Sequence, residues 1–277
     1  MITFFTIPKP FEGHIGTIQR NALASWTRVD PTAQVLVLGD ETGAADAAAE
    51  IGAEHVPELP RNEHGTPLLD GAFRIAAERR RNELLCYVNA DILFPRSLAD
   101  AARAAVGLQR PFLVVGECWN VRVDDRVDPD ATDWPALLRG ARKRGADAID
   151  YFVYTPELYD DVPPFSVGRP AFDNWLVWKA RDDGAAVVDA TWTVRALHQD
   201  HTYAHIGSLS QRNTSPEAAE NRRLTGGGRE RLYSRFDASH RLTSHGLVPN
   251  PLGYRHAGET ARRAWAKLGY ATGRRRS

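Results

Sequence analysis

Short apolar runs alternate with helical patterns over the first two thirds of the sequence, and this alternation constrains the fold more than any other feature. Runs typical of buried strands lie at residues 2–7, 34–38, 54–56, 84–88, 111–116, 148–154 and 185–189. Segments with helical spacing of apolar residues lie between them, at 15–26, 42–51, 67–80, 98–106 and 173–180. Strands that alternate with helices predict an α/β fold, in which a mostly parallel sheet is flanked by helices.

Composition narrows the class of protein. A chain of 277 residues that is 43% hydrophobic can bury a large core without disulfides, and Cys86 and Cys118 are too few for a disulfide framework. The 35 Lys and Arg residues balance 35 Asp and Glu residues, which argues against a dedicated nucleic-acid-binding protein. No apolar run reaches 18 residues and the first residues do not resemble a signal peptide, so we expect a cytoplasmic protein.

The last 70 or so residues carry no strong strand pattern, and we expect a helical C-terminal extension there. Gly226, Gly227 and Gly228 break the pattern, and residues 261–277 contain Arg and Lys but no acidic residue. Such a basic end could bind peripherally to an anionic membrane surface, here the inner face of the membrane, or it could be a solvated tail.

Ligands of doubly wound sheets bind at the carboxyl ends of the strands, so polar residues at those ends are the first candidates for a site. Asn89, Ala90 and Asp91 follow the most apolar strand. A carboxylate there could hold a divalent cation, or it could simply bond to a turn amide. Further on, His198, His201 and His205 lie close together; they could bind a metal or a phosphate, or be polar loop residues.

Three other positions combine polar groups with apolar surroundings. Asp173 follows a Gly-Arg-Pro turn at a predicted helix start, where it could be an N-cap or a rigidly held general base. Asp150 is a charge within an apolar strand, which is rare unless the group is paired or functional. Trp119 and Asn120 offer an aromatic face and an amide, a pair suited to sugar recognition, although Trp119 could equally be core.

Several common nucleotide and hydrolase motifs are absent from the sequence. It contains no Gly-x-Gly-x-x-Gly after the first strand and no P-loop, so dinucleotide oxidoreductases and P-loop NTPases lose their main support. It also lacks Gly-x-Ser-x-Gly, which argues against an α/β-hydrolase.

The order of these features resembles the GT-A fold of nucleotide-diphospho-sugar glycosyltransferases, over about residues 1–205. A first strand enters the nucleotide pocket, a middle strand ends in a motif of Asp-x-Asp type, an aspartate lies at a helix start, and a late histidine follows. Asn89 departs from the family pattern, because it occupies the first acidic position of the motif. This departure weakens metal binding and leaves a metal-independent variant open.

The resemblance implies a role for each matching position. Asp91, with His198 or His201, would hold Mn²⁺ or Mg²⁺ against the donor diphosphate, and Asp173 would be the general base of an inverting transferase. The positions expected to contact the nucleotide donor are Thr6, Ile7, Pro8, Asp40, Asn62, Gly65, Thr66, Asn89 and Ala90. The positions expected to contact the donor sugar or the acceptor are Trp119, Asn120, Asp150, Arg169 and Asn174.

The activity that this resemblance implies is transfer of a sugar from a UDP- or GDP-type donor to a hydroxyl of a glycan, lipid-linked or small-molecule acceptor. Residues 1–205 would form the catalytic domain, and residues 206–277 an acceptor or lid extension. Three alternatives remain: a catalytically idle nucleotide- or sugar-binding module, a sugar-phosphate nucleotidyltransferase, and a metal hydrolase built on the histidines. The nucleotidyltransferase would need a Gly-rich basic loop where Pro8-Lys9-Pro10 stands.

Overall fold

The computed structural model describes residues 1–145, 148–201, 213–251 and 253, and its elements alternate as the sequence predicts. The first half comprises β1 (Ile2–Thr6), α1 (Gly13–Trp26), β2 (Gln34–Leu38), α2 (Ala44–Glu50), β3 (Glu54–Val56), α3 (Leu69–Arg79), β4 (Leu84–Val88), β5 (Ile92–Leu93), α4 (Ser97–Val106), β6 (Phe112–Val115), β7 (Trp119–Val121) and α5 (Trp134–Gly140).

The second half is less regular. It comprises β8 (Arg142–Lys143), β9 (Tyr151–Tyr154), η1 (Pro156–Tyr159), α6 (Phe172–Asp182), β10 (Ala186–Asp189), α7 (Thr191–Val194), β11 (Leu197–Gln199), α9 (Pro216–Leu224), η2 (Arg229–Arg231), η3 (Arg235–Asp237), β12 (His240–Thr243) and β13 (Gly246–Pro249). None of the described helices is long and apolar enough to span a bilayer.

Nine strands form the central sheet, in the order β13-β12-β10-β6-β9-β4-β1-β2-β3. Neighbouring strands are parallel, except that β9 runs antiparallel to β4 and β6, and β13 runs antiparallel to β12. The inner strands β1, β2, β4, β6, β9 and β10 are buried along their whole length. Such strands read as continuous apolar runs, which explains why they were predictable from sequence.

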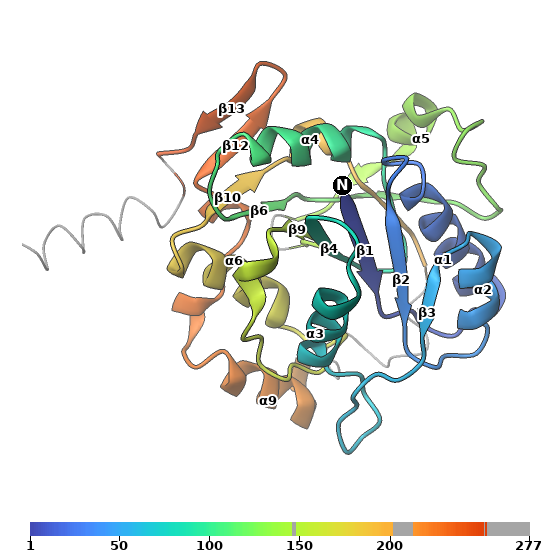
Figure 1. Cartoon of the computed structure of the whole chain (residues 1–277), viewed down its shortest axis with the longest axis horizontal. Helices are drawn as coiled ribbons and strands as arrows, with labels where there is room; N and C mark the ends of the chain where they lie inside the picture. The colour runs from blue at the N-terminus through green and yellow to red at the C-terminus, as the bar shows by residue number, and fades with distance from the viewer. Residues whose placement is uncertain (146–147, 202–212, 252, 254–277) are drawn as a thin grey trace, which may run out of the picture.

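Helices cover both faces of this sheet (Figure 1). Side chains alternate along β1, so that Phe4 faces a core shared with α1, α2 and α4. Phe5 points to the opposite face and joins a second core that includes residues of α3 and α6. The α/β fold class is therefore confirmed, with a packed layer of helices on each side of a mostly parallel sheet.

A second, smaller sheet lies beyond the carboxyl end of β4, with strand order β5-β11-β7-β8. Its strands have two or three residues each, too few for a period of two to stand out in the sequence. Sequence reasoning did not identify β5, β7, β8 or β11 as strands. This omission matters, because β11 carries His198 and β7 carries Asn120.

The C-terminal region differs from the expected helical extension. It contains α9, but β12 pairs with β10 and β13 pairs with β12, so that two strands of this region belong to the central sheet. Their residues, His-Arg-Leu-Thr and Gly-Leu-Val-Pro, are only partly buried, which is why the sequence carries no strong strand pattern there. The basic residues 261–277 and His205 lie outside the described residues.

Candidate active site

The carboxyl ends of β1, β4 and β11 meet at a cavity of about 940 Å³. Many of the residues singled out from the sequence line it. They are Ile7, Pro8, Asn89, Ala90, Asp91, Asp150, Arg169, Asp173, His198 and His201. This position is where parallel sheets bind ligands. It also brings together residues that lie more than a hundred positions apart in the sequence.

Asp91 and two histidines form the centre of this cavity. The Oδ2 atom of Asp91 lies 3.0 Å from His201 Nε2 and 3.5 Å from His198 Nε2. All three groups can present one ligand atom within 4.8 Å of the others. Asp91 Oδ1 and His198 Nδ1 are buried without a hydrogen-bond partner among the described residues. Because buried polar atoms are seldom left unpaired, this set fits a divalent cation with mixed oxygen and nitrogen ligands.

The small sheet explains how the histidines reach Asp91. Strand β11 pairs with β5, which follows Asp91 directly, and His198 lies opposite Ile92. The neighbouring Gln199 bonds to the Asp91 carbonyl through both its backbone N–H and its side-chain amide, each at 3.1 Å. The main chain on both sides of the cluster is therefore held in register. Because residues 197–199 form a strand, His198 and His201 do not reach Asp91 from one face of a helix.

The electrostatics of the cluster favour an ionised carboxylate. Burial opposes ionisation of Asp91, but the charges and hydrogen bonds of His198 and His201 outweigh it and hold the Asp91 pKa well below its usual range. Burial likewise lowers the pKa of His198, yet the Asp91 carboxylate overcomes this and raises it. The site therefore presents negative charge to a cation while its histidines can donate to an anionic ligand.

Asn89 and Asp150 form a second polar pair on the wall of the cavity. Asn89 Nδ2 donates to Asp150 Oδ1 at 2.9 Å, and the Asn89 N–H donates to the Asp150 carbonyl at 3.0 Å. Arg144 binds the other oxygen of Asp150 at 2.5 Å. Asp150 lies just before β9, not within it as expected. Asn89 binds one of its carboxylate oxygens and Arg144 binds the other.

Asp173 also lines the cavity. Helix α6 begins at Phe172, with Ala171 as the N-cap at a φ of 96°, so that Asp173 lies in the first turn and is not the N-cap. Its Oδ1 accepts from the Asn174 N–H at 3.0 Å. Burial dominates the raised pKa of Tyr87, and Asp173, Asp150 and Asp91 raise it further in that order. All three carboxylates line the same cavity.

Eight of the predicted contacts do not line the cavity, three of them in the loop before α3. Thr6 is fully buried, and Asp40 is a mostly exposed partner of Arg61 at 2.6 Å. Trp119 packs in a small apolar cluster with Leu93. Asn174 Nδ2 donates to the Tyr233 carbonyl at 2.7 Å, which ties α6 to the C-terminal region. Asn120 pairs in register with His198, and its buried Oδ1 has no hydrogen-bond partner among the described residues.

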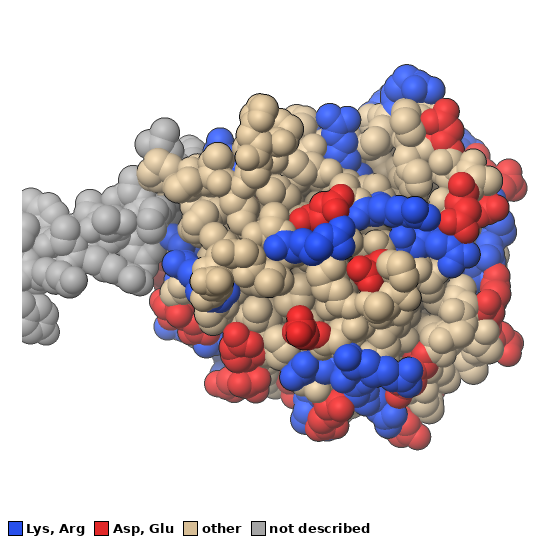
Figure 2. All heavy atoms as spheres, turned by 45° about the horizontal axis from the view of Figure 1, so that its top comes forward, with Lys and Arg blue, Asp and Glu red and all other residues tan. Residues whose placement is uncertain are grey.

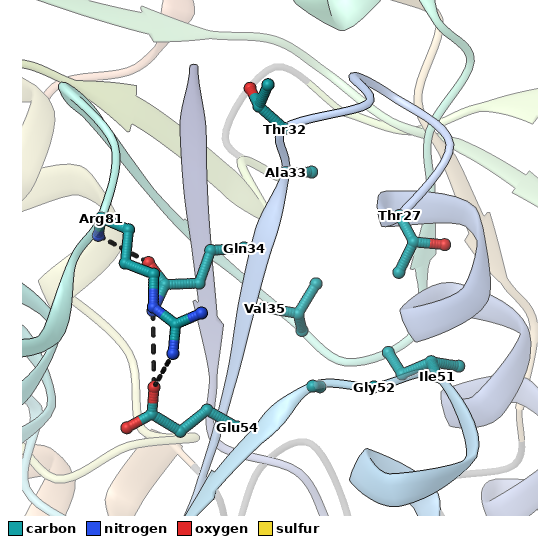
Figure 3. A pocket seen from close by; sticks show the side chains of 10 residues that line it. Thr27, Thr32, Ala33, Gln34, Val35, Ile51, Gly52, Glu54 and Arg81 are labelled. Atoms are coloured by element: carbon teal, nitrogen blue, oxygen red, sulfur yellow. Dashed lines mark hydrogen bonds and ion pairs between the residues drawn. The ribbon is translucent and has the colours of Figure 1, made fainter.

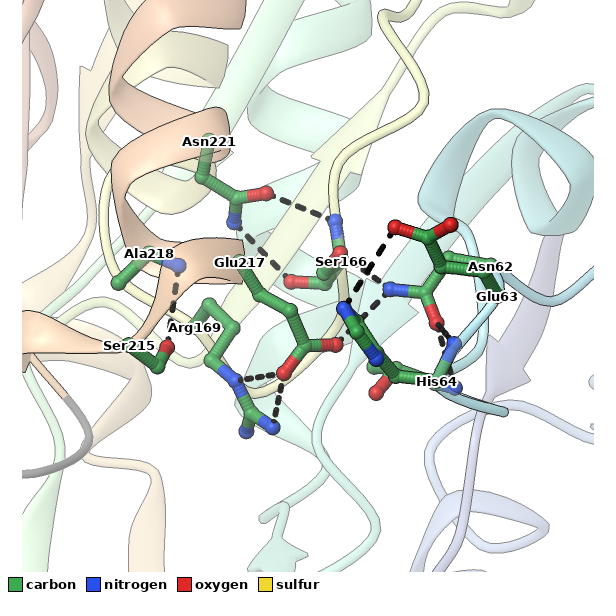
Figure 4. A network of polar contacts seen from close by, with 10 residues as sticks. Asn62, Glu63, His64, Ser166, Arg169, Ser215, Glu217, Ala218 and Asn221 are labelled. Atoms are coloured by element: carbon green, nitrogen blue, oxygen red, sulfur yellow. Dashed lines mark hydrogen bonds and ion pairs between the residues drawn. The ribbon is translucent and has the colours of Figure 1, made fainter.

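Asn62, Arg169 and Glu217 belong to a polar network at the start of α9 (Figure 4), and Thr66 bonds to the same Glu217. Asn62 Nδ2 donates to Glu217 Oε1 at 2.8 Å, and Glu217 also binds Arg169 at 2.5 Å. Burial would raise the Glu217 pKa, but the hydrogen bonds from Thr66, Asn62 and Arg169 lower it to about 2. Gly65 O accepts from Arg61 at 2.9 Å. None of Asn62, Gly65 and Thr66 lines the cavity, whereas Arg169 does.

Two basic residues that line this cavity, Lys9 and Arg144, were not predicted as site residues. Lys9 follows β1, and the Gln19 side chain holds it by accepting from its N–H at 2.7 Å and donating to its carbonyl at 2.8 Å. A lysine between two prolines at a strand end was a usable signal. Arg144 precedes a poorly patterned segment, so nothing in the sequence pointed to it.

Two further surfaces carry no comparable chemistry. A cavity of about 290 Å³ lies by the amino ends of β2 and β3, where Arg81 bonds to Gln34 and pairs with Glu54 (Figure 3). It is at the opposite edge of the sheet from Asp91. On the face shown in Figure 2, Lys and Arg side chains lie beside Asp and Glu side chains, as the balanced net charge suggests.

No protein-family model and no curated protein matches the sequence. Solved structures do match. S. aureus TarS 1–349 in complex with UDP-GlcNAc has a TM-score of 0.52 and 13% identity, and the match covers 81% of this chain and 65% of that chain. The same protein in complex with UDP has a TM-score of 0.52 and 14% identity, with 81% and 64% covered.

The chain thus spans about two thirds of the TarS segment that it matches. M. tuberculosis glucosyl-3-phosphoglycerate synthase has a TM-score of 0.47 and 16% identity, with 82% and 81% covered, too distant a match to add to the assignment. At these identities the likeness to TarS concerns the fold. The chain therefore has a GT-A-like glycosyltransferase fold.

Proposed function

We propose that this protein is a glycosyltransferase that moves a sugar from a nucleotide-diphospho-sugar to an acceptor hydroxyl with the help of a divalent cation. The observation that carries this proposal is the convergence of Asp91, His198 and His201 with Asp150 and Asp173 on one cavity. The GT-A-like fold supports it, and so do the UDP-GlcNAc and UDP complexes of the TarS structures.

The cation would be held by Asp91, His198 and His201, and Mn²⁺ or Mg²⁺ suits such a site. When bound, it would neutralise charge on the departing diphosphate. The chain offers its own donors for the same task, because Lys9, Arg144 and Arg169 line the cavity. Fixed cationic groups that face a developing anion stabilise it more inside a cavity than in water.

Asp173 would act as the general base. Its carboxylate would take the proton of the acceptor hydroxyl while that oxygen forms a bond to the anomeric carbon. The bond from the anomeric carbon to the diphosphate oxygen breaks in the same step, and the electron pair leaves with the nucleoside diphosphate. One displacement of this kind inverts the anomeric centre. Asp150, fixed by Asn89 and Arg144, would bind hydroxyls of the transferred sugar.

The proposal is tested by the thermal stability of the protein with UDP, GDP, CMP or dTDP, each with and without Mn²⁺. A ligand that binds only the native state raises the melting temperature with its concentration. We expect one nucleotide to raise it, Mn²⁺ to increase the rise, and Asp91→Asn to remove the Mn²⁺-dependent part. Asp46→Asn is the matched control, because Asp46 is exposed on α2.

The outcomes separate the proposal from its rivals. If no nucleotide raises the melting temperature, the glycosyltransferase assignment is wrong. If a nucleotide binds but no nucleotide-sugar is turned over or hydrolysed by the wild type, the protein is an idle binding module. If binding is unaffected by Mn²⁺ and by Asp91→Asn, the cation has no part in it and Lys9, Arg144 and Arg169 carry the diphosphate alone.

A further inference from the structure

A second cavity, of about 510 Å³, opens at the carboxyl ends of β10 and β12. We call it the Trp192 cleft. Its walls include Asp189 from β10, Trp192 and Thr193 from α7, and Arg235, Arg241 and Thr243 from the C-terminal region. No residue predicted from the sequence lines it. Two separate parts of the chain build it, because β12 joins the sheet beside β10.

Trp192 is the most exposed of the large apolar side chains that the structure describes, at 59%. The Trp119 ring supports it from one side, with centroids 5.8 Å apart and planes at 72°. The Lys143 ammonium lies 5.0 Å from the Trp192 ring centroid. An indole that is held in place yet left open beside a cavity is typical of a ligand-binding surface.

One positively charged side chain of the cleft, Arg241, is available to bind a ligand. Arg235 is almost fully buried and is answered by Glu117 at 2.8 Å and Asp189 at 3.1 Å, while Lys143 pairs with Glu117 at 3.0 Å. Arg241, by contrast, is exposed and has no hydrogen bond or ion pair with any described residue. Its guanidinium can therefore bind a phosphate or a carboxylate in bidentate fashion.

The Trp192 cleft adjoins the first cavity along the same edge of the sheet. Glu117, which binds Arg235, forms a bridge pair with Ile149, and Ile149 lines the first cavity. Lys143, which lies against Trp192, is followed by Arg144, which also lines that cavity. A ligand bound on Trp192 would therefore lie beside the Lys143–Arg144 segment, which also borders the first cavity.

We propose that the Trp192 cleft is the acceptor subsite, and that it binds a saccharide carrying a phosphate or carboxylate group. Trp192 would stack on the sugar ring, and Arg241 would bind the anionic group. The assignment as an acceptor subsite rests on the proposed function, whereas the binding of an anionic saccharide does not. This inference names the class of acceptor, which the first cavity alone leaves open.

Saturation-transfer NMR with glucose 6-phosphate, glucuronic acid and maltotriose, and with inorganic phosphate as a competitor, tests the proposal on the full chain loaded with UDP and Mg²⁺. We expect the two anionic sugars to bind, and Trp192→Ala to weaken them about tenfold or more, as loss of an aromatic anchor does. Arg241→Gln should weaken the anionic sugars and leave the weaker binding of maltotriose unchanged. Trp192→Phe should restore most of the affinity.

Arg28→Gln is the matched control, because Arg28 is a half-exposed arginine next to Thr27 at the opposite edge of the sheet. The proposal is overturned if neither anionic sugar binds the UDP-loaded chain, or if Trp192→Ala and Arg241→Gln bind them as the wild type does. Inorganic phosphate binding as tightly as glucose 6-phosphate would also overturn it. In each of these cases the proposed function would still stand if UDP raises the melting temperature of the wild type. If no nucleotide raises it, the proposed function itself is refuted.

Discussion

The amide of Asn89 has a structural reason to be neutral. Its Nδ2 donates to the Asp150 carboxylate at 2.9 Å, so an aspartate at this position would set two carboxylates against each other. Asn89 therefore departs from the Asp-x-Asp pattern because its amide binds the Asp150 carboxylate. The cation site that the geometry supports uses Asp91 and two histidines instead of two neighbouring acids.

We therefore predict that Asn89→Asp lowers the stability of the fold and does not raise the affinity for a metal ion. Loss of the hydrogen bond and the added repulsion should lower the free energy of unfolding by about 1–3 kcal/mol. Urea unfolding measures this change, and titration of the UDP complex with Mn²⁺ measures the metal affinity. Asn89→Ala is the control that removes the bond without adding charge, and it should cost less. A higher Mn²⁺ affinity in Asn89→Asp would contradict this reading.

Asp173→Asn tests the proposed base without changing the shape of the side chain. We expect kcat to fall by about 10²–10⁴-fold, the usual contribution of a general base, while the KM of the donor changes little. Steady-state kinetics with the nucleotide-sugar selected by the thermal screen separate these two effects. If the variant keeps near wild-type kcat, another group takes the proton.

At this scale, the sequence predicted the residues that end a strongly apolar strand. Asp91 was recognisable because it follows β4, and His198 and His201 because histidines so close together are uncommon. Asp40 was recognisable by the same rule, yet it lies with Arg61 away from the cavity. A strand end gives the edge of the sheet at which a residue lies, but not the direction of its side chain.

At the scale of the elements, α9 is attached to the loops before α3 and α6 by Glu217. Its carboxylate accepts from Asn62 and Arg169, and its pKa is lowered to about 2 from 4.5. A group whose pKa is lowered by folding stabilises the protein above its unfolded pKa, and this contribution is lost as the pH falls through the folded pKa. The window of loss is therefore about pH 4.5 down to about 2.

We predict that Glu217→Gln lowers the free energy of unfolding at pH 7 by about 2 kcal/mol, because charged hydrogen bonds are lost. The difference from the wild type should shrink as the pH falls from 4.5 towards 2. Urea unfolding at several pH values measures it. Glu220→Gln is the matched control on the same helix. Among the described residues Glu220 pairs with Arg223 at the surface, which lowers its pKa in an exposed position, so the effect of this variant and its pH dependence should be smaller.

Gly116 marks a close approach between two strands. A Cβ atom at this position would lie 2.2 Å from the hydroxyl oxygen of Tyr151, a fully buried side chain at the start of β9. We predict that Gly116→Ala lowers the free energy of unfolding by about 1–3 kcal/mol, as overpacking does. The double variant with Tyr151→Phe should recover part of this loss, which a double-mutant cycle measures. Gly140→Ala, with open space around it, should cost little; an equal cost there would refute the steric account.

Long, buried elements were predicted well, and so was the short strand β3, to the residue. Strands β2 and β4, with five buried residues each, were predicted to the residue, and α4 to within one residue. The two-residue strand β5 and the exposed helix α5 gave no periodic signal. The small sheet brings His198 to Asp91. The sequence therefore predicted the order of the site residues along the chain, but not that they meet in space.

For the whole molecule, the sequence predicted the fold class but not how the C-terminal region attaches. A division into a catalytic part at 1–205 and an extension at 206–277 stays a prediction. The pairing of β12 with β10 argues against two independent units. Arg235 argues against them as well, because it is nearly buried and binds both Glu117 and Asp189. These contacts join the C-terminal region to the central sheet at β10 and to the segment after β6.

We therefore predict that a chain ending at residue 205 does not fold on its own. Without Arg235, the buried Asp189 carboxylate loses its cationic partner and the buried Glu117 carboxylate keeps only Lys143, and breaking a buried pair in this way costs about 3–5 kcal/mol. That loss is a large share of the 5–15 kcal/mol by which domains are stable. Circular dichroism melting and size exclusion of the truncated chain measure the outcome, and Arg235→Gln in the full chain should reproduce most of the loss. A truncated chain that melts cooperatively near the wild-type temperature would show instead that residues 1–205 form an independent domain.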